Sequence, residues 1–162
     1  MPTILEVCQG RLPESRFGSG EVIIAEGTPA GKLFILAEGT VEVVKDTYVI
    51  NTLSDPGAVF GEISVLLDTV HTATVRATSP TRFFVVDDPL EFMRSTPEVA
   101  LGVARLLAHR LHAMTTYLVD LKHQFEQHTD HFGMVDEVLD ALSHSQPEDH
   151  TPGSDREREP NY

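Results

Sequence analysis

Short apolar runs separated by glycine-containing turns fill the chain from residue 17 to residue 88. β-branched and aromatic residues dominate the runs, and glycine at the breaks supplies the positive φ that tight turns require. Because runs of this length between turns are typical of sandwiches and barrels, the pattern predicts an all-β core of roughly eight strands. The clearest runs are residues 22–25, 33–37, 41–44, 48–53, 73–77 and 82–86.

After residue 96 the apolar pattern changes to a helical period. Thr96 is a suitable N-cap, Pro97 suits the first helical position, and Glu98 places an acid in the first turn. Gly102 costs about 1 kcal/mol relative to alanine inside a helix. We therefore expect a bend at Gly102, or two consecutive helices.

Apolar residues in this helical region recur at alternating intervals of four and three. This spacing is the seam of a coiled coil and predicts a homodimer formed through the long helix. A lone helix with such a stripe would instead pack on its own β domain, and the spacing alone leaves both arrangements open. The predicted dimerisation residues are Leu107, Leu111, Met114, Leu118, Leu121 and Phe125.

The end of the chain has two further segments. Thr129 and Asp130 would cap a short helix with an apolar face from Met134 to Leu142, and the polar residues after it predict a disordered acidic tail. The predicted layout is a β-roll ligand-binding domain at 1–96, a long closing and dimerisation helix at 97–128, a short helix at 129–144 and a tail at 145–162.

The chain of 162 residues has a formal net charge of -13, and acids outnumber bases in every segment. Nucleic-acid affinity depends mostly on Lys and Arg, so we expect no direct DNA binding, and an anionic membrane surface is disfavoured for the same reason. Cys8 is the only cysteine, which excludes an internal disulfide. No leader or membrane-spanning run is apparent, and we expect a cytoplasmic protein.

The most informative motif is FGEISVLL at residues 60–67, followed by HTATV at residues 71–75. Together with the preceding glycines and the long helix, it resembles the cyclic-nucleotide-binding domain of the catabolite activator protein (Crp/Fnr) superfamily. The resemblance implies a mainly β double-stranded β-helix, or jelly roll, followed by a long dimerisation helix. The glycines that carry the resemblance are Gly20, Gly27, Gly39, Gly57 and Gly61.

The resemblance also implies a ligand, cAMP or cGMP or another small anion, and no cofactor. Gly61 would let the backbone approach the ligand, Glu62 would accept from a ribose hydroxyl, and Thr72 would donate to a phosphate oxygen. The first N–H groups of a short helix at residues 63–67 favour an anion. The expected ligand-binding residues are Gly61, Glu62, Ile63, Ser64, His71, Thr72, Ala73, Thr115 and Thr116, the last two reaching the purine.

His71 stands where the family has a phosphate-binding arginine, and strand alternation predicts that it faces inward. Histidine is mostly neutral at pH 7, so losing the charged pair costs on the order of 1.5 to 3 kcal/mol, about ten- to two-hundredfold in affinity. Three outcomes are open for the missing charge. A bound phosphate would stabilise the protonated imidazole of His71, or the side chain of Arg76 or Arg82 would reach the phosphate instead. In the third, the pocket would hold another ligand or none. We expect weakened or altered nucleotide binding.

The histidines do not form the pattern of a metal site. A metal site in a β-roll needs several His and Glu ligands that converge from strands, whereas His71 is the only histidine before residue 109. Two later pairs, His109 with His112 and His128 with His131, have no acidic third ligand at matching spacing. We predict no metal.

Nucleophilic chemistry has no better candidate. Ser64 lies beside Glu62 without a histidine placed by sequence, Cys8 has no partner motif, and Asp87 and Asp88 before Pro89 suggest a strand exit and turn. We therefore expect a regulatory module that signals through its helix to an effector protein, and not an enzyme. The alternative is a dimeric scaffold with a degenerate pocket.

Overall fold

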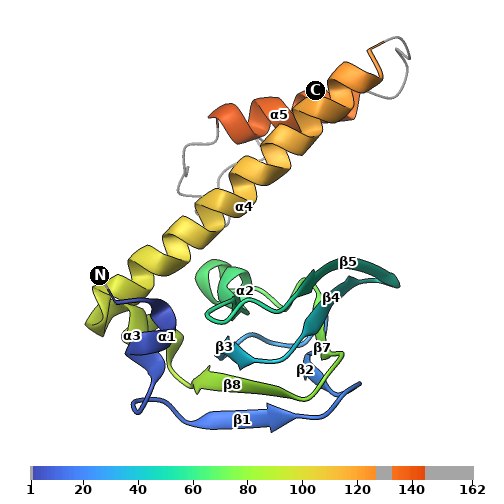
Figure 1. Ribbon diagram of the computed structural model, residues 1–162. Coiled ribbons are helices and arrows are strands. Elements are labelled where there is room, and N and C mark those ends of the chain that lie inside the picture. The colour runs from blue at the N-terminus through green and yellow to red at the C-terminus, as the bar shows by residue number, and fades with distance from the viewer. Residues whose placement is uncertain (1, 127–132, 145–162) are drawn as a thin grey trace, which may run out of the picture. The chain divides into compact units, whose positions relative to one another are not determined.

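The computed structural model describes residues 2–126 and 133–144, in two compact units of which one ends at Leu107 and the other begins at Ala108. The first unit is a β-roll of two antiparallel sheets (Figure 1), ordered β1-β8-β3-β6 and β2-β7-β4-β5. This confirms the predicted jelly roll followed by a long helix. The strands are β1 (Glu14–Phe17), β2 (Val22–Ile24), β3 (Leu33–Glu38), β4 (Val41–Lys45), β5 (Tyr48–Leu53), β6 (Val59–Phe60), β7 (Thr74–Ala77) and β8 (Thr81–Val86).

Apolar side chains from both sheets meet in the middle of the roll. Phe83 lies at the centre of this core, and its ring makes edge-to-face contacts with Phe17, Phe34 and Phe60 at centroid distances of 5.8, 6.2 and 6.0 Å. Such contacts add to the free energy gained by burying the rings. The buried members of this core are Ile24, Leu36, Val41, Phe60, Val75 and Phe83.

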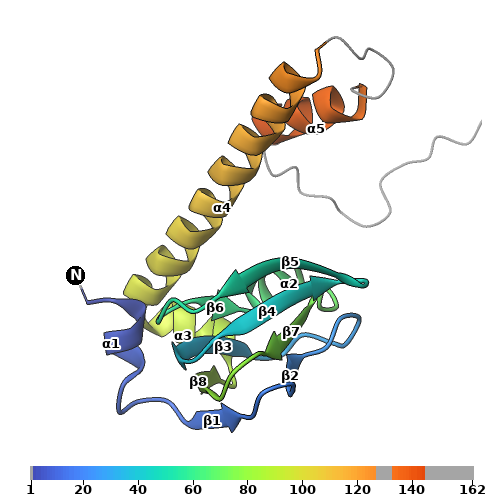
Figure 2. The same cartoon turned by 45° about the vertical axis from the view of Figure 1, so that its right-hand side comes forward.

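Three helical segments cover the opposite face of the first sheet. They are α1 (Ile4–Cys8), α3 (Pro89–Ser95) and the start of α4 (Pro97–Gln124), and Figures 1 and 2 place α1 and α3 at one end of the roll. The first unit extends beyond residue 96 because α4 packs into this second core. Its buried residues are Val7, Cys8, Leu33, Ile35, Val59, Phe84, Val86, Met93, Val99 and Val103.

Two short helices, α1 and α3, were not predicted from the sequence. Asp88 does follow a strand end, as predicted, but it is the N-cap of α3, and its side chain accepts from the Glu91 N–H at 3.2 Å with Pro89 in the first turn. Thr3 and Glu6 form a capping box that begins α1. Helices of five and seven residues contain too few turns for an apolar period to reveal them.

The helix predicted to begin at Pro97 is confirmed, but the expectation of a bend or a second helix at Gly102 is wrong. α4 runs without interruption from Pro97 to Gln124 (Figure 1). A methyl group on Gly102 would lie 2.7 Å from Ile4 Cδ1 and 2.8 Å from Ile4 Cγ1. The glycine is therefore explained by close packing of α1 on α4.

The second unit contains the rest of α4 and α5 (Gly133–His144), which corresponds to the short helix predicted near the end of the chain. Within this unit, Lys122 Nζ donates to a carboxylate oxygen of Asp136. The predicted cap at residues 129–130 and the predicted tail at 145–162 lie outside the described residues. Among the described helices, none has the length and hydropathy needed to cross a membrane.

Candidate ligand-binding site

A tight turn after β6 leads into α2 (Glu62–Leu67), which confirms the short helix predicted from residue 63. Gly61 is its N-cap, with φ at 89° and no side-chain cap. A methyl group at Gly61 would lie only 2.9 Å from the carbonyl oxygen of Lys32. Both the left-handed backbone and this close approach require glycine.

The first turn of α2 directs two polar side chains into the protein. Glu62 is 2% exposed and Ser64 is also buried, whereas Ile63 between them is exposed. Carboxylates are seldom this buried, because burial is costly unless polar groups surround them. The sequence predicted all three as ligand-binding residues, and the structure places two of them inside.

His71 packs on the same turn. Its ring atom Cε1 lies 3.6 Å from the position of a methyl group at Gly61. The His71 N–H donates to the Thr28 carbonyl and its own carbonyl accepts from the Gly27 N–H, each at 2.8 Å. The inward orientation predicted for His71 is confirmed, since the residue is only 8% exposed.

Burial also favours the neutral form of the His71 imidazole. Removal from water lowers the pKa of His71 below its ordinary value of 6.5. The ring is therefore neutral at pH 7 and lacks the permanent charge of an arginine. His71 lies outside the strand whose alternation predicted its orientation, because β7 begins at Thr74 and residues 71–73 form a bent segment.

The rest of this segment is more open. Thr72 is exposed and Ala73 is half-buried. The Thr72 carbonyl accepts from Lys45 Nζ at 2.7 Å, and Lys45 also donates to Glu26 Oε1 at 2.7 Å. Sequence reasoning missed Lys45 and Glu26, because charged residues beside turns are common and only the fold brings these two to residues 71–74.

Neither arginine proposed as a replacement reaches this site. Arg76 pairs with Glu42 across strands β7 and β4. Arg82 belongs to the other sheet, where it pairs with Glu14 at 3.1 Å and with Glu38 at 3.8 Å. The arginine alternative is therefore wrong, and His71 is the polar side chain that lies beside Gly61.

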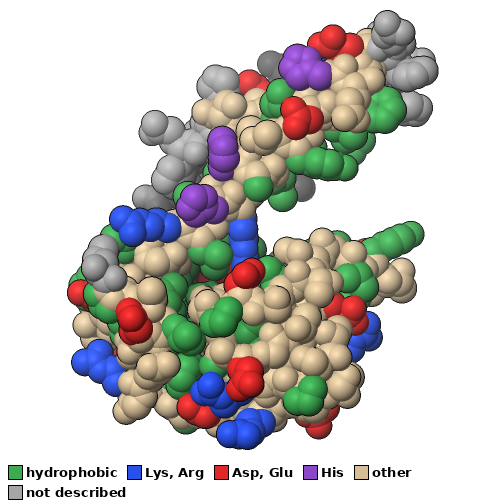
Figure 3. Space-filling view, in the orientation of Figure 1, with side chains coloured by type: hydrophobic (Ala, Val, Ile, Leu, Met, Phe, Trp, Pro, Cys, Tyr) green, Lys and Arg blue, Asp and Glu red, His purple; other side chains and the backbone are tan. Residues whose placement is uncertain are grey.

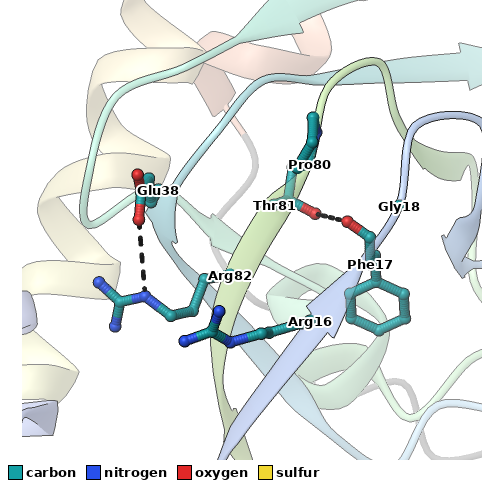
Figure 4. Close-up of a pocket in the computed structure, with 7 residues that line it drawn as sticks. All are labelled: Arg16, Phe17, Gly18, Glu38, Pro80, Thr81 and Arg82. Atoms are coloured by element: carbon teal, nitrogen blue, oxygen red, sulfur yellow. Dashed lines mark hydrogen bonds and ion pairs between the residues drawn. The ribbon is translucent and has the colours of Figure 1, made fainter.

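Arg82 instead lines a separate cleft of about 330 Å³ (Figure 4). This cleft contains none of the predicted ligand-binding residues. Its two arginines lie directly opposite each other on β1 and β8, and Glu14 and Glu38 pair with only one of them. The cleft lining is Arg16, Phe17, Gly18, Glu38, Pro80, Thr81 and Arg82.

The sequence of the first unit is similar to a known domain family. Residues 14–90 match the family described as the cyclic nucleotide-binding domain. Residues 14–90 therefore form a domain of this family, with a fold similar to that of the catabolite activator protein. This confirms the resemblance seen in the glycines and in the motif at residues 60–75.

The relatives place this domain in several larger proteins. It is 37% identical over 76 residues to a cAMP-dependent protein kinase regulatory subunit of Yarrowia lipolytica, covering 47% of this chain and 20% of that protein. It is 32% identical over 119 residues to the acetyltransferase Pat of Mycolicibacterium smegmatis, covering 71% and 36%. The match thus spans well under two thirds of either relative.

Two solved structures show the same fold as this chain. The catabolite activator protein of Thermus thermophilus has a TM-score of 0.64 and 26% identity over 75% of this chain and 60% of that one. The cAMP-bound PfPKA-R has a TM-score of 0.54 and 26% identity over 68% of this chain and 37% of that one.

The remaining predicted residues lie on α4. Leu107 packs against the core of the first unit, so at this position the helix follows the alternative in which it covers its own domain. Thr115 Oγ1 donates to the Leu111 carbonyl at 2.9 Å, and Thr116 is exposed. Both threonines belong to the second unit, and their contact with a purine stays a prediction. Of the other seam residues, Leu111, Met114 and Phe125 are exposed and Leu118 and Leu121 are half-buried.

Other candidate chemistry finds no support in the described residues. Cys8 is completely buried, and burial raises the pKa of its thiol to about 11, which disfavours the nucleophilic thiolate. Within residues 2–126 and 133–144, no three His, Cys, Asp or Glu side chains cluster as metal ligands would. His128 and His131 lie outside that part of the chain. On the face drawn in Figure 3, basic side chains of the β-roll are interspersed with acidic ones.

Proposed function

We propose that the protein is a regulatory module that senses a cyclic nucleotide, or a similar small anion, at the site formed by residues 61–64 and 71–73. The observation that carries this proposal is the buried Glu62 at the start of α2, next to Gly61 and facing the same turn as His71. The family match and the cAMP-dependent relative support a nucleotide as the ligand.

Each residue has a role that its position allows. Glu62 accepts from the ribose 2′-hydroxyl, which selects a ribonucleotide. The backbone N–H groups at Gly61 and Ile63, at the start of α2, face the ligand. The exposed Thr72 hydroxyl donates to a phosphate oxygen, and Ser64 and Ala73 line the same site.

The affinity is lower than that of a domain with arginine at this position. A neutral imidazole offers one N–H, whereas a guanidinium offers two parallel donors and a permanent charge. Replacing such a pair costs about ten- to two-hundredfold in affinity. Protonation of His71 on binding recovers part of this loss.

The signal passes through α4 in a homodimer. Leu111 and Met114 are 47% and 56% exposed in the single chain, and a partner helix would cover them. A ligand that binds one dimer geometry more tightly than another shifts the population toward it. An effector protein then recognises that geometry, and the module itself acts as a regulator and not as a catalyst.

A matched pair of ligands tests the role of Glu62. We expect cAMP to bind more tightly than 2′-deoxy-cAMP, and we expect Glu62→Gln to remove most of this preference, about fivefold or more, because the charged acceptor is lost. Isothermal titration calorimetry measures both. Glu38→Gln, which neutralises an exposed carboxylate of the other sheet, is the control. Equal affinity of the wild type for both nucleotides would exclude the proposed ribose contact.

A second candidate is a dimeric scaffold whose pocket binds no nucleotide. The packing of a neutral His71 ring against Gly61 favours it, because the ring occupies space beside the turn. In that case Glu62→Ala leaves cellular activity intact, whereas a substitution that splits the dimer abolishes it. The sensor hypothesis expects both substitutions to impair activity.

A further inference from the structure

Two loops converge on residues 71–74, which comprise the bent segment and the first residue of β7. From the turn after β2, the Glu26 N–H donates to Thr74 Oγ1 at 3.0 Å, and Gly27 and Thr28 exchange backbone hydrogen bonds with His71. From the tip of the β4–β5 hairpin, Lys45 Nζ reaches the Thr72 carbonyl. Figure 2 shows β4 beside both β5 and β7, an arrangement that brings the hairpin to this segment.

Lys45 and Glu26 join the two loops to each other. Lys45 Nζ donates at 2.7 Å to Glu26 Oε1 and at 2.7 Å to the Thr72 carbonyl, while Glu26 Oε2 accepts from the Asp46 N–H at 3.0 Å. The hydrogen bond from Lys45 lowers the pKa of Glu26, and Glu26 raises the pKa of Lys45. Both groups are therefore charged at neutral pH, and their hydrogen bonds are charge-assisted.

Thr72 and Ala73 need such support because neither belongs to the β-ladder. β7 pairs with β4 only from Thr74 onward, and residues 71–73 lie before that ladder. Thr72 itself is exposed, so packing does not fix its peptide either. A side-chain hydrogen bond from Lys45 thus holds the carbonyl of Thr72, the residue next to His71 in the proposed ligand site.

We propose that Lys45, held by Glu26, is a positioning residue that keeps the peptide of Thr72 in the conformation that receives the anionic ligand. This inference rests on the proposed function. It adds that the β4–β5 hairpin sets the affinity of a site whose ligand it does not touch. A segment that is already ordered binds more tightly, because the ligand does not have to immobilise it.

The expected effect is moderate, because the pair is partly exposed to solvent. Lys45→Met removes the ammonium but keeps the length of the side chain, and we expect the Kd for cAMP to rise about three- to tenfold. Glu26→Gln should act in the same direction. Lys45→Arg retains the charge and the donors, so most of the affinity should return.

The experiment measures cAMP binding calorimetrically in the wild-type background and in the His71→Arg background. Lys32→Met is the matched control, because it also removes a lysine with an ion pair, and its partner Asp87 is not part of the 71–74 segment. Amide hydrogen exchange at His71 and Gly27, whose N–H groups bond within these loops, reports order without any ligand. Thermal unfolding confirms that each variant is folded.

The possible outcomes distinguish the positioning role of Lys45 from the proposed sensor function. Support requires weaker binding and faster exchange in Lys45→Met, recovery in Lys45→Arg and no change in Lys32→Met. If cAMP binds the wild type or His71→Arg and Lys45→Met binds equally well, the positioning role is wrong while the sensor function stands. If cAMP binds neither background, the proposed function itself fails, and the positioning role fails with it.

Discussion

At the scale of single residues, the proposed function makes His71 the residue that sets the affinity of the site for an anion. Burial lowers the pKa of its imidazole, so the free protein presents a neutral ring to the ligand. An anionic ligand next to the ring would favour the protonated form and raise the pKa. The two states therefore differ in proton affinity, and ligand binding becomes linked to pH.

The first prediction follows from this linkage. Affinity of the wild type for cAMP should increase as pH falls through the raised pKa of the bound state, and it should level off below the lowered pKa of the free state, which is under 6.5. Calorimetry between about pH 8 and pH 5 measures the trend. His71→Gln, which does not titrate, should give a flat profile. A wild-type affinity independent of pH would contradict protonation of His71 on binding.

Folding stability should change with pH in the opposite direction. Because the pKa of His71 is lower in the folded protein than in the unfolded chain, the unfolded chain takes up more protons. The contribution of the neutral ring to stability is complete above pH 6.5 and declines as pH falls below that value. Titrations at low pH therefore need a check that the protein remains folded.

At the scale of elements, Gly102 shows how one residue fits two helices together. A methyl group there would clash with Ile4 at 2.7 Å, although alanine would suit the helix better by about 1 kcal/mol. Overpacking of this kind typically costs about 1 to 3 kcal/mol. The clash should thus cancel or exceed the gain in helix propensity.

The second prediction tests this balance. Gly102→Ala should leave stability unchanged or lower it by about 1 to 2 kcal/mol, whereas in an Ile4→Ala background the same change should stabilise by about 1 kcal/mol. Urea unfolding of the four variants gives the coupling energy. Equal effects in both backgrounds would mean that α1 does not constrain this glycine.

The helices and strands differ in how well the sequence predicts them. Glycine-punctuated runs predicted the β-roll because positive φ and strand patterning are local properties, and Gly61 has the backbone conformation that a turn into α2 requires. The buried Glu62 was predicted through a family motif and not through periodicity. α1 and α3 were missed because their signals are caps alone.

Contacts between distant segments were harder to predict. Gly102 was interpreted from helix propensity, which takes no account of Ile4 nearly a hundred residues earlier in the chain. Lys45 and Glu26 are nineteen residues apart, and their meeting at Thr72 depends on how β2, β4 and β7 pair. No local sequence pattern predicts that Lys45 and Glu26 come into contact.

At the scale of the whole molecule, the exposed apolar side chains of α4 suggest a partner helix. Leu118 lies in the middle of the predicted seam, and a carboxylate at a desolvated position between helices is strongly unfavourable. The net charge of -13 opposes self-association, so the apolar contact has to outweigh electrostatic repulsion.

The third prediction is that the wild type forms dimers in sedimentation equilibrium at micromolar concentration, and that Leu118→Glu weakens the dimer at least a hundredfold. Leu101→Glu is the control, because Leu101 is an exposed leucine of the same helix outside the seam. A monomeric wild type, or a Leu118→Glu variant that still dimerises, would rule out the seam as the interface.

The central claim is that residues 61–64 and 71–73 form an anion site weakened by histidine. Calorimetric titration of the wild type and of His71→Arg with cAMP at pH 7.5 tests it most directly. We predict weak but measurable binding by the wild type and affinity about ten- to two-hundredfold higher for His71→Arg. No binding by either protein at high concentration, with both folded, would contradict the account.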